Sequence, residues 1–515
     1  MLAIMMVVAK LIGALYRVPL TNTVGAEGMG LYQMVFPLYT VLLAFCGGGF
    51  TSALSRVVAK YTAHGDDETA LRAVKVAVIP LSVVSALSAG AVVLLRNVIS
   101  GIQGNTEASF AYLALAPSLL FAGGINVIRG YFQGRSMTVP SGVSQLAEQV
   151  IKLALGLYLA RVMMAYGVKY AVMGALIGVS VSELVALVYL TVRFIIFRRG
   201  RKVTISSVAV LNAEHAIDNA IVTDSMLLKE IYGFALPVTL GSLVLPVTQI
   251  IDSALVINIL LHGGQSRDGA TALFGLFVGP VGTLINMPTV VVVAVAVAFL
   301  PALTSAIERG KDEREITQSA AKWIMLFVLP ITIAFLFFPD RIVNTLYRRG
   351  LTDYQLAIAS RLLRTQAVGV FYVGVLQIAT AALQARNRSH VPVVNLTVGA
   401  CVKVGLTPIL VRYIGIIGAS VATAACYGVA AILTVRSAYK ISPFCCGIVQ
   451  SFVVPLSFSL LACGAFYLTV RGAHGLPYLW QTVIGAGVAL FVYALSLLFE
   501  IKKIVVIFRA RKKIQ

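Results

Sequence analysis

Long stretches without a charged side chain recur along this sequence and constrain its fold more than any other feature. Residues 290–300 are all apolar, and residues 324–338 contain no charge. A helix needs about 20 mostly apolar residues to cross the hydrocarbon layer of a membrane. The alternating segments of about 10 residues that are typical of membrane-spanning strands do not occur. Because only helices and closed barrels satisfy their backbone hydrogen bonds inside a bilayer, we predict an all-α integral membrane protein.

The composition leads to the same class of protein. Of the 515 residues, 59% are hydrophobic and 12% are charged, which is about half the charged fraction of a typical soluble domain. The formal net charge is +21, but no nucleic-acid motif accompanies it. We therefore attribute the charge to cytoplasmic loops and to attraction toward anionic headgroups, and we expect membrane lipids but no nucleic acid as partners.

The polar breaks divide the chain into about fourteen predicted spans of the length that a bilayer requires. The first segment lacks a basic leading region and a small-residue cleavage site, so we interpret it as a span and not as a signal peptide. The predicted spans are 2–20, 29–55, 73–95, 109–133, 138–160, 170–196, 230–260, 272–301, 318–339, 355–384, 391–411, 414–437, 447–470 and 478–501.

The lysines and arginines predict the orientation of these spans. With a cytoplasmic N-terminus, about 25 of the 41 basic residues lie in inside segments and about 10 lie in outside loops, as the positive-inside rule requires. We predict a multi-pass protein of the cell membrane with both termini in the cytoplasm.

An internal repeat with an offset of about 250 residues organises the chain. A glutamine, a lysine and an arginine recur with the same spacing in both halves: Gln133, Lys152 and Arg161, then Gln384, Lys403 and Arg412. The repeat predicts two pseudo-symmetric six-helix lobes plus two extra helices at the C-terminal end, an architecture typical of transporters. The predicted domains are an N-terminal lobe 1–197, a cytoplasmic linker 198–229, a C-terminal lobe 230–440, and the two extra helices with a basic tail, 441–515.

Charged side chains inside spans are costly and are therefore candidates for function. Lys10 and Arg17 are seven residues apart, which places them about two turns apart on one helix face. Two cations on one face suit a diphosphate; alternatively, Arg17 reaches out to the interface. Arg56 is a third candidate for ligand binding or a topology anchor. Asp252 would neutralise a basic group, bind a coupling cation or proton, or pair with a neighbouring helix.

A second set of residues is expected to have a gating or structural role. Glu148 lies four residues before Lys152 and can pair with it along a helix, and Lys403 is the equivalent of Lys152 in the second half. Glycines and prolines interrupt several spans and permit bending. Representative breaks are at Gly48, Pro246 and Pro288.

No constellation of catalytic residues is recognisable, and the six cysteines lack metal-ligand spacing. We therefore expect neither an enzyme nor a metal site. The sequence contains no ATP-binding domain and no cofactor motif. Any energy input would come from a Na⁺ or H⁺ gradient, from the membrane potential, or from the gradient of the substrate.

Four stretches of the sequence resemble the stage V sporulation protein B branch of polysaccharide exporters: 30–61, 234–256, 273–291 and 382–395. The superfamily also includes lipid II flippases of the MurJ type and multidrug exporters of the MATE type. The resemblance implies two six-helix lobes, a cationic cavity and movement of an undecaprenyl-linked precursor. In the lipid II branch, basic residues on the first helix line the cavity, which corresponds to Lys10 and Arg17 here. An arginine pair in the second helix of that branch is replaced by the uncharged segment 44–46.

Three functions stay open from the sequence. The favoured one is a flippase that moves a polyprenyl-linked sugar, lipid II or a related polysaccharide unit, to the outer leaflet for cell-wall, spore-cortex or polysaccharide synthesis, together with cell-wall synthesis proteins. The second is a drug/cation antiporter of the same fold. The third is a non-transporting scaffold, which would leave Lys10 and Arg17 unexplained.

Overall fold

The computed structural model describes residues 2–208, 223–309, 314–441 and 449–512, and every regular element in these ranges is a helix. Thirteen of the helical segments are long and apolar enough to cross a membrane. The prediction of an all-α, multi-pass membrane protein is confirmed. The chain divides into two compact units, unit 1 (Met1–Gly279) and unit 2 (Pro280–Gln515).

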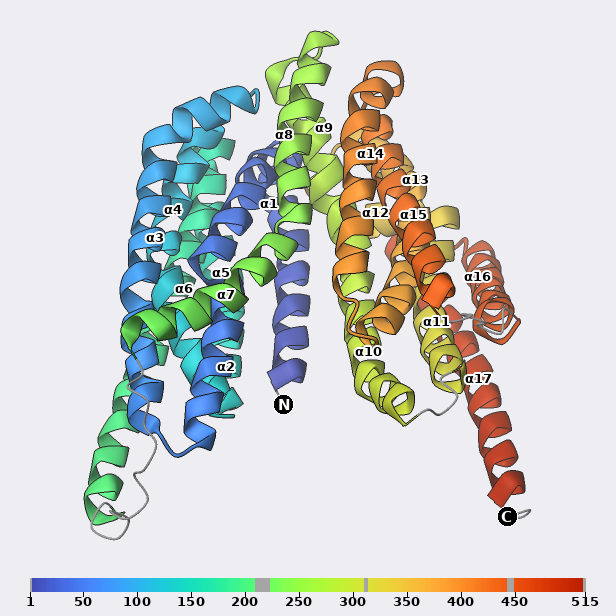
Figure 1. Cartoon of the computed structure of the whole chain (residues 1–515). Coiled ribbons are helices and arrows are strands. Elements are labelled where there is room, and N and C mark those ends of the chain that lie inside the picture. The colour runs from blue at the N-terminus through green and yellow to red at the C-terminus, as the bar shows by residue number, and fades with distance from the viewer. Residues whose placement is uncertain (1, 209–222, 310–313, 442–448, 513–515) are drawn as a thin grey trace. The chain divides into compact units, whose positions relative to one another are not determined.

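Unit 1 contains the first nine α-helices (Figure 1). Their bounds are α1 Leu2–Leu43, α2 Gly49–Ala63, α3 Asp67–Ile102, α4 Ala108–Gly134, α5 Thr138–Met163, α6 Val168–Val208, α7 Asp224–Ser242, α8 Val244–His262 and α9 Arg267–Leu276. The predicted linker is partly helical, because α6 extends to Val208, and residues 209–222 lie outside the described part of the chain. The domain boundaries proposed from the repeat stay a prediction.

The first two predicted spans form one segment with a break between them. Met5–Ala63 is helical over 59 residues, about 90 Å at the rise of an α-helix, whereas the hydrocarbon layer is about 30 Å thick. Gly25 interrupts α1 with φ +70° and ψ −171°, a conformation that glycine adopts without steric cost. In Figure 1 the N-terminus and the end of α2 lie at the same end of unit 1, so this segment crosses the bundle twice.

The predicted seventh span, 230–260, is wrong as a single helix. The chain breaks at Leu243, and only α8 is among the candidate spans. Figure 1 shows α7 running transversely to α3 and α4. A buried stripe at four-residue spacing, Leu227, Ile231, Ala235 and Thr239, holds α7 against α2.

Two exposed ion pairs also tie α7 to neighbouring helices. Lys60 Nζ lies 2.9 Å from Glu230 Oε1, and Arg72 Nε lies 2.6 Å from Asp224 Oδ1. Exposed pairs of this kind contribute only about 0–1 kcal/mol each. The buried stripe therefore supplies most of the attachment of α7.

A buried polar network joins α8 and α9 to the rest of unit 1. Gln103 Nε2 donates to the Met34 carbonyl and to Ser253 Oγ, both at 3.0 Å. Asn105 Nδ2 donates to Thr271 Oγ1 at 2.9 Å. Because buried polar groups lose stability when they are left without partners, these bonds fix α8 and α9 within unit 1 although the repeat assigns them to the second half.

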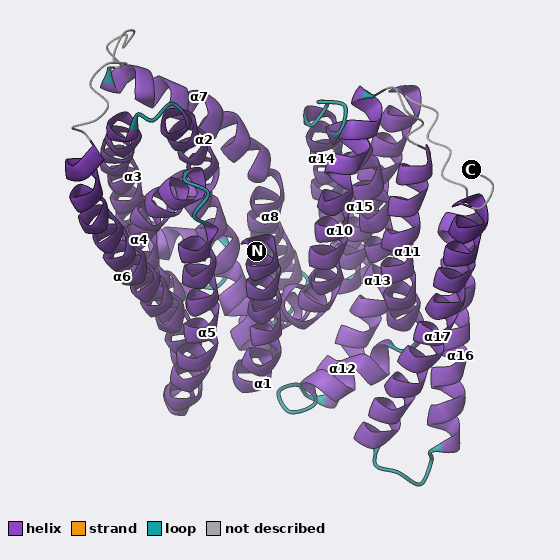
Figure 2. Cartoon of the chain, turned by 90° about the horizontal axis from the view of Figure 1, so that it is seen from below, coloured by secondary structure: helices purple, strands orange, loops and turns teal. Residues whose placement is uncertain are grey.

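Unit 2 contains the remaining α-helices, and Figure 2 shows its short helix α12 lying across the direction of α17. Their bounds are α10 Gly282–Glu308, α11 Arg314–Phe337, α12 Pro339–Tyr347, α13 Asp353–Gln384, α14 His390–Ile414, α15 Ile416–Ile441, α16 Val454–Gly472 and α17 Tyr478–Lys512. Helices α16 and α17 pack on each other, and α16 packs on α11. These are the two extra helices that the sequence predicts.

Two turns at equivalent positions of the repeat have the same geometry. Ser136, after α4, has φ +59°, and Asn387, after α13, has φ +58°. The following amides, of Met137 and Arg388, bond to the carbonyls five residues back, Phe132 and Leu383. This agreement in backbone detail supports the pseudo-symmetry of the two six-helix sets.

Candidate functional site

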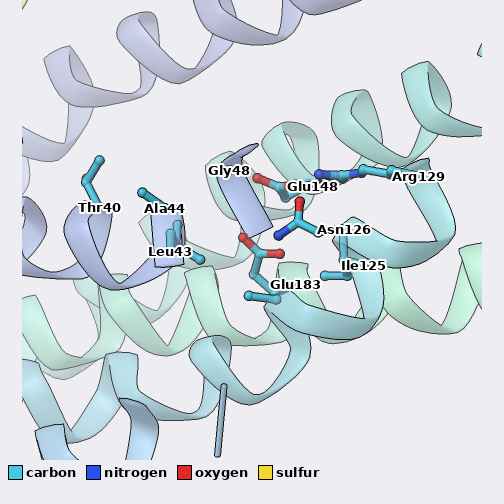
Figure 3. Close-up of a pocket in the computed structure, with 10 residues that line it drawn as sticks. Thr40, Leu43, Ala44, Gly48, Ile125, Asn126, Arg129, Glu148 and Glu183 are labelled. Atoms are coloured by element: carbon cyan, nitrogen blue, oxygen red, sulfur yellow. Dashed lines mark hydrogen bonds and ion pairs between the residues drawn. The ribbon is translucent and has the colours of Figure 1, made fainter. Parts of the chain in front are cut away.

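A cavity of about 330 Å³ lies within unit 1, at the break between α1 and α2 (Figure 3). A π-helical segment, Ala44–Gly48, connects those two helices there, a feature that is frequent at functional sites. The lining residues come from α1, this segment, α4, α5 and α6: Thr40, Leu43, Ala44, Gly48, Ala122, Ile125, Asn126, Arg129, Glu148 and Glu183.

An ion pair between α4 and α5 forms one side of the cavity. Arg129 Nη2 lies 3.1 Å from Glu148 Oε2, and the two side chains are 12% and 16% exposed. Arg129 Nε donates to Ser144 Oγ at 3.0 Å, and Gln149 Nε2 donates to Glu148 Oε1 at 3.0 Å. A pair this well buried requires such additional bonds, because desolvation of both charges offsets their attraction.

A second carboxylate, Glu183 on α6, lies deeper in the same cavity and is 8% exposed. Tyr39 donates its hydroxyl to Glu183 Oε1 at 3.4 Å. Glu183 also interacts electrostatically with Glu148, Arg129 and Lys152. Two carboxylates and two cations of one bundle are thus coupled to one another.

Asn126 lies between the two carboxylates in Figure 3. Its Oδ1 accepts a hydrogen bond from Thr51 Oγ1 at 3.1 Å. The side chain lies directly over Gly47, where an added methyl group would overlap with the amide. Gly47 therefore allows α4 to bring a polar amide to the break between α1 and α2.

A line of cations continues from the cavity along α1. At Gly13, α1 approaches α5 so closely that an added methyl group would lie 3.7 Å from Lys152 Nζ. Lys152 Nζ lies 5.8 Å from the centre of the Tyr16 ring and interacts electrostatically with Arg17. Residues three and four apart lie on one helix face, so Gly13 shares a face of α1 with Lys10, which is exposed, and with Arg17.

The other predicted site residues are spread over both units. Arg56 is exposed on α2, with its guanidinium carbon 5.2 Å from the Phe234 ring centre. Asp252 is 3% exposed on α8. Pro246 lies in the first turn of α8, where a missing amide hydrogen costs no helical bond. Lys403 (7% exposed) and Pro288 are buried in unit 2, on α14 and α10.

The cavity brings together Gly48, Glu148 and, through its charge, Lys152, which the sequence predicts as gating or structural residues. Sequence reasoning missed Arg129 and Asn126, because Arg129 lies near the end of the predicted span 109–133 and Asn126 carries no charge. In the structure α4 continues to Gly134, so Arg129 is more than a turn inside the helix. Among the described residues, no group of three or more histidines, cysteines, aspartates or glutamates is arranged to hold a metal ion.

A family model described as "Polysaccharide biosynthesis protein" matches residues 1–307. Stage V sporulation protein B of Bacillus subtilis (strain 168) is 25% identical over 421 residues, covering 81% of this chain and 78% of that protein. Lipid II flippase MurJ of the same organism is 24% identical over 444 residues, covering 82% and 78%.

Solved structures share the fold. A structure described as "Lipid II flippase MurJ, inward closed conformation" superposes with a TM-score of 0.73 at 14% identity, covering 98% of this chain and 99% of the other. An inward-facing multidrug resistance MATE family transporter of the MOP superfamily superposes with a TM-score of 0.65 at 16% identity, covering 85% and 95%. At these identities the likeness concerns the architecture.

Proposed function

The chain belongs to the polysaccharide biosynthesis protein family, and we propose that it is a flippase for a polyprenyl-diphosphate-linked sugar such as lipid II or a related polysaccharide unit. The names of its relatives, a lipid II flippase and a sporulation protein, support this class of substrate. A role in transport, rather than in an enzymatic reaction, accounts for the fold that it shares with transporters.

The line of cations in unit 1 is the observation that carries the proposal. Lys152 and Arg17 interact electrostatically where α1 meets α5, and the exposed Lys10 lies about two turns before Arg17 on the same face of α1. A diphosphate offers several anionic oxygens to such a group, and hydrogen bonds between charged partners are about twice as strong as neutral ones. A lipid-facing cluster of three cations would be far more costly.

The neighbouring carboxylates leave this line of cations positive. Arg129 pairs with Glu148 at 3.1 Å and so offsets the charge of this carboxylate, which also interacts electrostatically with Lys152. Glu183 is held by Tyr39. The cations therefore outnumber the carboxylates that face them, which favours an anionic ligand.

In this proposal the substrate moves from the cytoplasmic to the outer leaflet of the cell membrane by alternating access. A Na⁺ or H⁺ gradient or the membrane potential would supply the energy, and cell-wall synthesis proteins would receive the product. The orientation with both termini in the cytoplasm belongs to the same proposal.

The second candidate is a cation-coupled drug exporter. Two carboxylates, Glu148 and Glu183, line a cavity inside unit 1, and the architecture is shared with a multidrug transporter. Carboxylates that line a membrane cavity are suited to organic cations or to coupling ions. The ion pair with Arg129 counts against this candidate, because it already satisfies one of the two carboxylates.

Ligand binding to purified, full-length protein tests the two candidates. We expect lipid II to bind to the wild type and the variant Lys10→Ala/Arg17→Ala to lose at least about tenfold in affinity, since contacts of a charged group contribute about 1.5–3 kcal/mol each. Arg161→Ala/Arg193→Ala is the matched control, because it removes two exposed cations from other helices of unit 1. Absence of lipid II binding by folded protein, together with Na⁺- or H⁺-dependent binding of an organic cation, would favour the exporter.

A further inference from the structure

Five arginines gather at the end of unit 2 where α11, α12, α13, α16 and α17 begin or end. We call them the outer arginine surface: Arg341, Arg348, Arg349, Arg361 and Arg364. Figure 2 shows α12 and the turn between α16 and α17 at this same end of the unit. The predicted orientation places this end away from the cytoplasm, where the positive-inside rule leads us to expect few basic residues.

Contacts with Asp340 and Tyr478 link three of these arginines, Arg341, Arg348 and Arg364. Arg364 Nη2 lies 3.4 Å from Asp340 Oδ2. The Arg341 guanidinium carbon lies 4.7 Å from the Tyr478 ring centre, and its Nη1 donates to Gln481 Oε1 at 3.2 Å. Tyr478 interacts electrostatically with Arg341, Asp340 and Arg348. Asp340 therefore pairs with Arg364, and Tyr478 lies within the electrostatic reach of Asp340, Arg341 and Arg348.

The remaining arginines are available to a ligand. Arg348, Arg349 and Arg361 are exposed, and among the described residues none of the three forms an ion pair. The acids of this end are Asp340 and the exposed Asp353. The five cations therefore exceed the local acids, and the surface carries a net positive charge.

Aromatic and apolar side chains mark the same end as a membrane–water boundary. Tyr354 is 73% exposed, Trp480 56% and Phe337 63%. Exposed tyrosine and tryptophan are typical of the headgroup level of a bilayer. Helix α12 buries Pro339, Val343 and Tyr347 on one face, as a short helix lying in this plane is expected to do.

We propose that the outer arginine surface binds the phosphate groups of anionic bilayer lipids, such as phosphatidylglycerol, in the leaflet that it borders. Guanidinium groups match phosphate oxygens in charge and in geometry. The exposed Phe337, at the end of α11, and Trp480, at the start of α17, offer apolar surface at the same end of the unit for the acyl chains, which a free phosphate ion or an acidic protein would not need. The bound lipids would hold α12 and the start of α17 at a fixed depth in the membrane.

The test compares phosphatidylglycerol with phosphatidylcholine on full-length protein by native mass spectrometry and by titration of fluorescent lipid in detergent. The patch variant is Arg348→Gln/Arg349→Gln/Arg361→Gln. The control, Arg388→Gln/Arg436→Gln/Lys440→Gln, removes three exposed cations from the opposite end of unit 2. Thermal unfolding of all three proteins shows whether each variant is folded.

We expect the patch variant to lose at least about tenfold in affinity for phosphatidylglycerol, because each basic group near an anionic surface contributes about 1 kcal/mol. The control variant should lose less than about twofold, and binding to the wild type should weaken with added NaCl. Equal losses in both variants, or no preference of the wild type for phosphatidylglycerol, would overturn the proposal. It would also be overturned if the patch variant lost binding of lipid II but kept phosphatidylglycerol, because the surface would then serve the transported substrate.

Discussion

Arg129 on α4 and Glu148 on α5 form an ion pair of 3.1 Å at the wall of a cavity in unit 1, and a second carboxylate, Glu183, interacts electrostatically with both. The pair therefore performs two tasks. It joins two helices, and it offsets part of the negative charge that Glu148 exerts on Lys152. Each task predicts a different response to substitution.

Removal of one partner of the ion pair should destabilise unit 1. Arg129→Gln leaves two largely buried carboxylates coupled to each other without this cation, which we expect to cost about 2–4 kcal/mol in the free energy of unfolding. Arg129→Gln/Glu148→Gln removes both charges and should recover more than half of that loss. Denaturant unfolding of the detergent-solubilised protein provides the measurement. A double variant as unstable as the single one would show that the attraction between these two charges is not what holds α4 to α5.

Gly47 and Gly48 differ sharply in the space around them. A methyl group on Gly47 would overlap with the Asn126 amide, whereas one on Gly48 would meet only the Ala44 side chain, at 3.6 Å. Gly47→Ala should therefore cost about 1–3 kcal/mol and lower transport, whereas Gly48→Ala should behave like the wild type. Because the Asn126 Cβ would also lie 2.4 Å from the added methyl group, Gly47→Ala/Asn126→Gly is the variant that relieves the overlap, and it should restore part of the stability. Equal unfolding midpoints for the two glycine variants would contradict this account.

The fold was largely predictable because membrane spans depend on local composition. Segments 29–55 and 355–384, for example, correspond to parts of helical segments that the structure contains. The division of 230–260 into two helices was not predictable from the sequence. The position of α7 depends on the packing of its buried stripe on α2, and the hydropathy of α7 carries no signal of this tertiary contact.

The candidate site was predictable only in part, for a related reason. Lys10 and Arg17 are visible as cations inside an apolar segment. Arg129 is hidden by its nearness to a helix end, and Asn126 by its neutrality. Their importance arises from the approach of α4 to the break after α1, and this approach depends on Gly47.

Glu183 offers a way to separate the electrostatic role of the cavity from its structural role. Glu183→Gln keeps the shape of the side chain and its contact with Tyr39, but removes a negative charge that acts on Lys152. If the ligand is a diphosphate, its affinity should rise by about two- to fivefold, as expected for the loss of one charge at an intermediate dielectric constant. Glu107→Gln, at the far end of α4, serves as the control. A fall in diphosphate affinity with normal stability would indicate that the carboxylate itself contacts the ligand or a coupling cation.

The equivalent turns at Ser136 and Asn387 provide a test of the pseudo-symmetry that does not involve transport. Both residues have φ near +60°, a conformation that is unfavourable for serine and better tolerated by asparagine. Ser136→Gly should therefore stabilise the protein by about 0.5–1 kcal/mol, and Asn387→Gly by less. Ser136→Val and Asn387→Val should both destabilise it, because β-branched side chains disfavour this region. Thermal unfolding of the four variants checks the order. A wide difference between the unfolding temperatures of the two valine variants would show that the turns share a backbone geometry but not the same strain. The two halves would then be similar in sequence and shape, but the equivalent turns would contribute differently to stability.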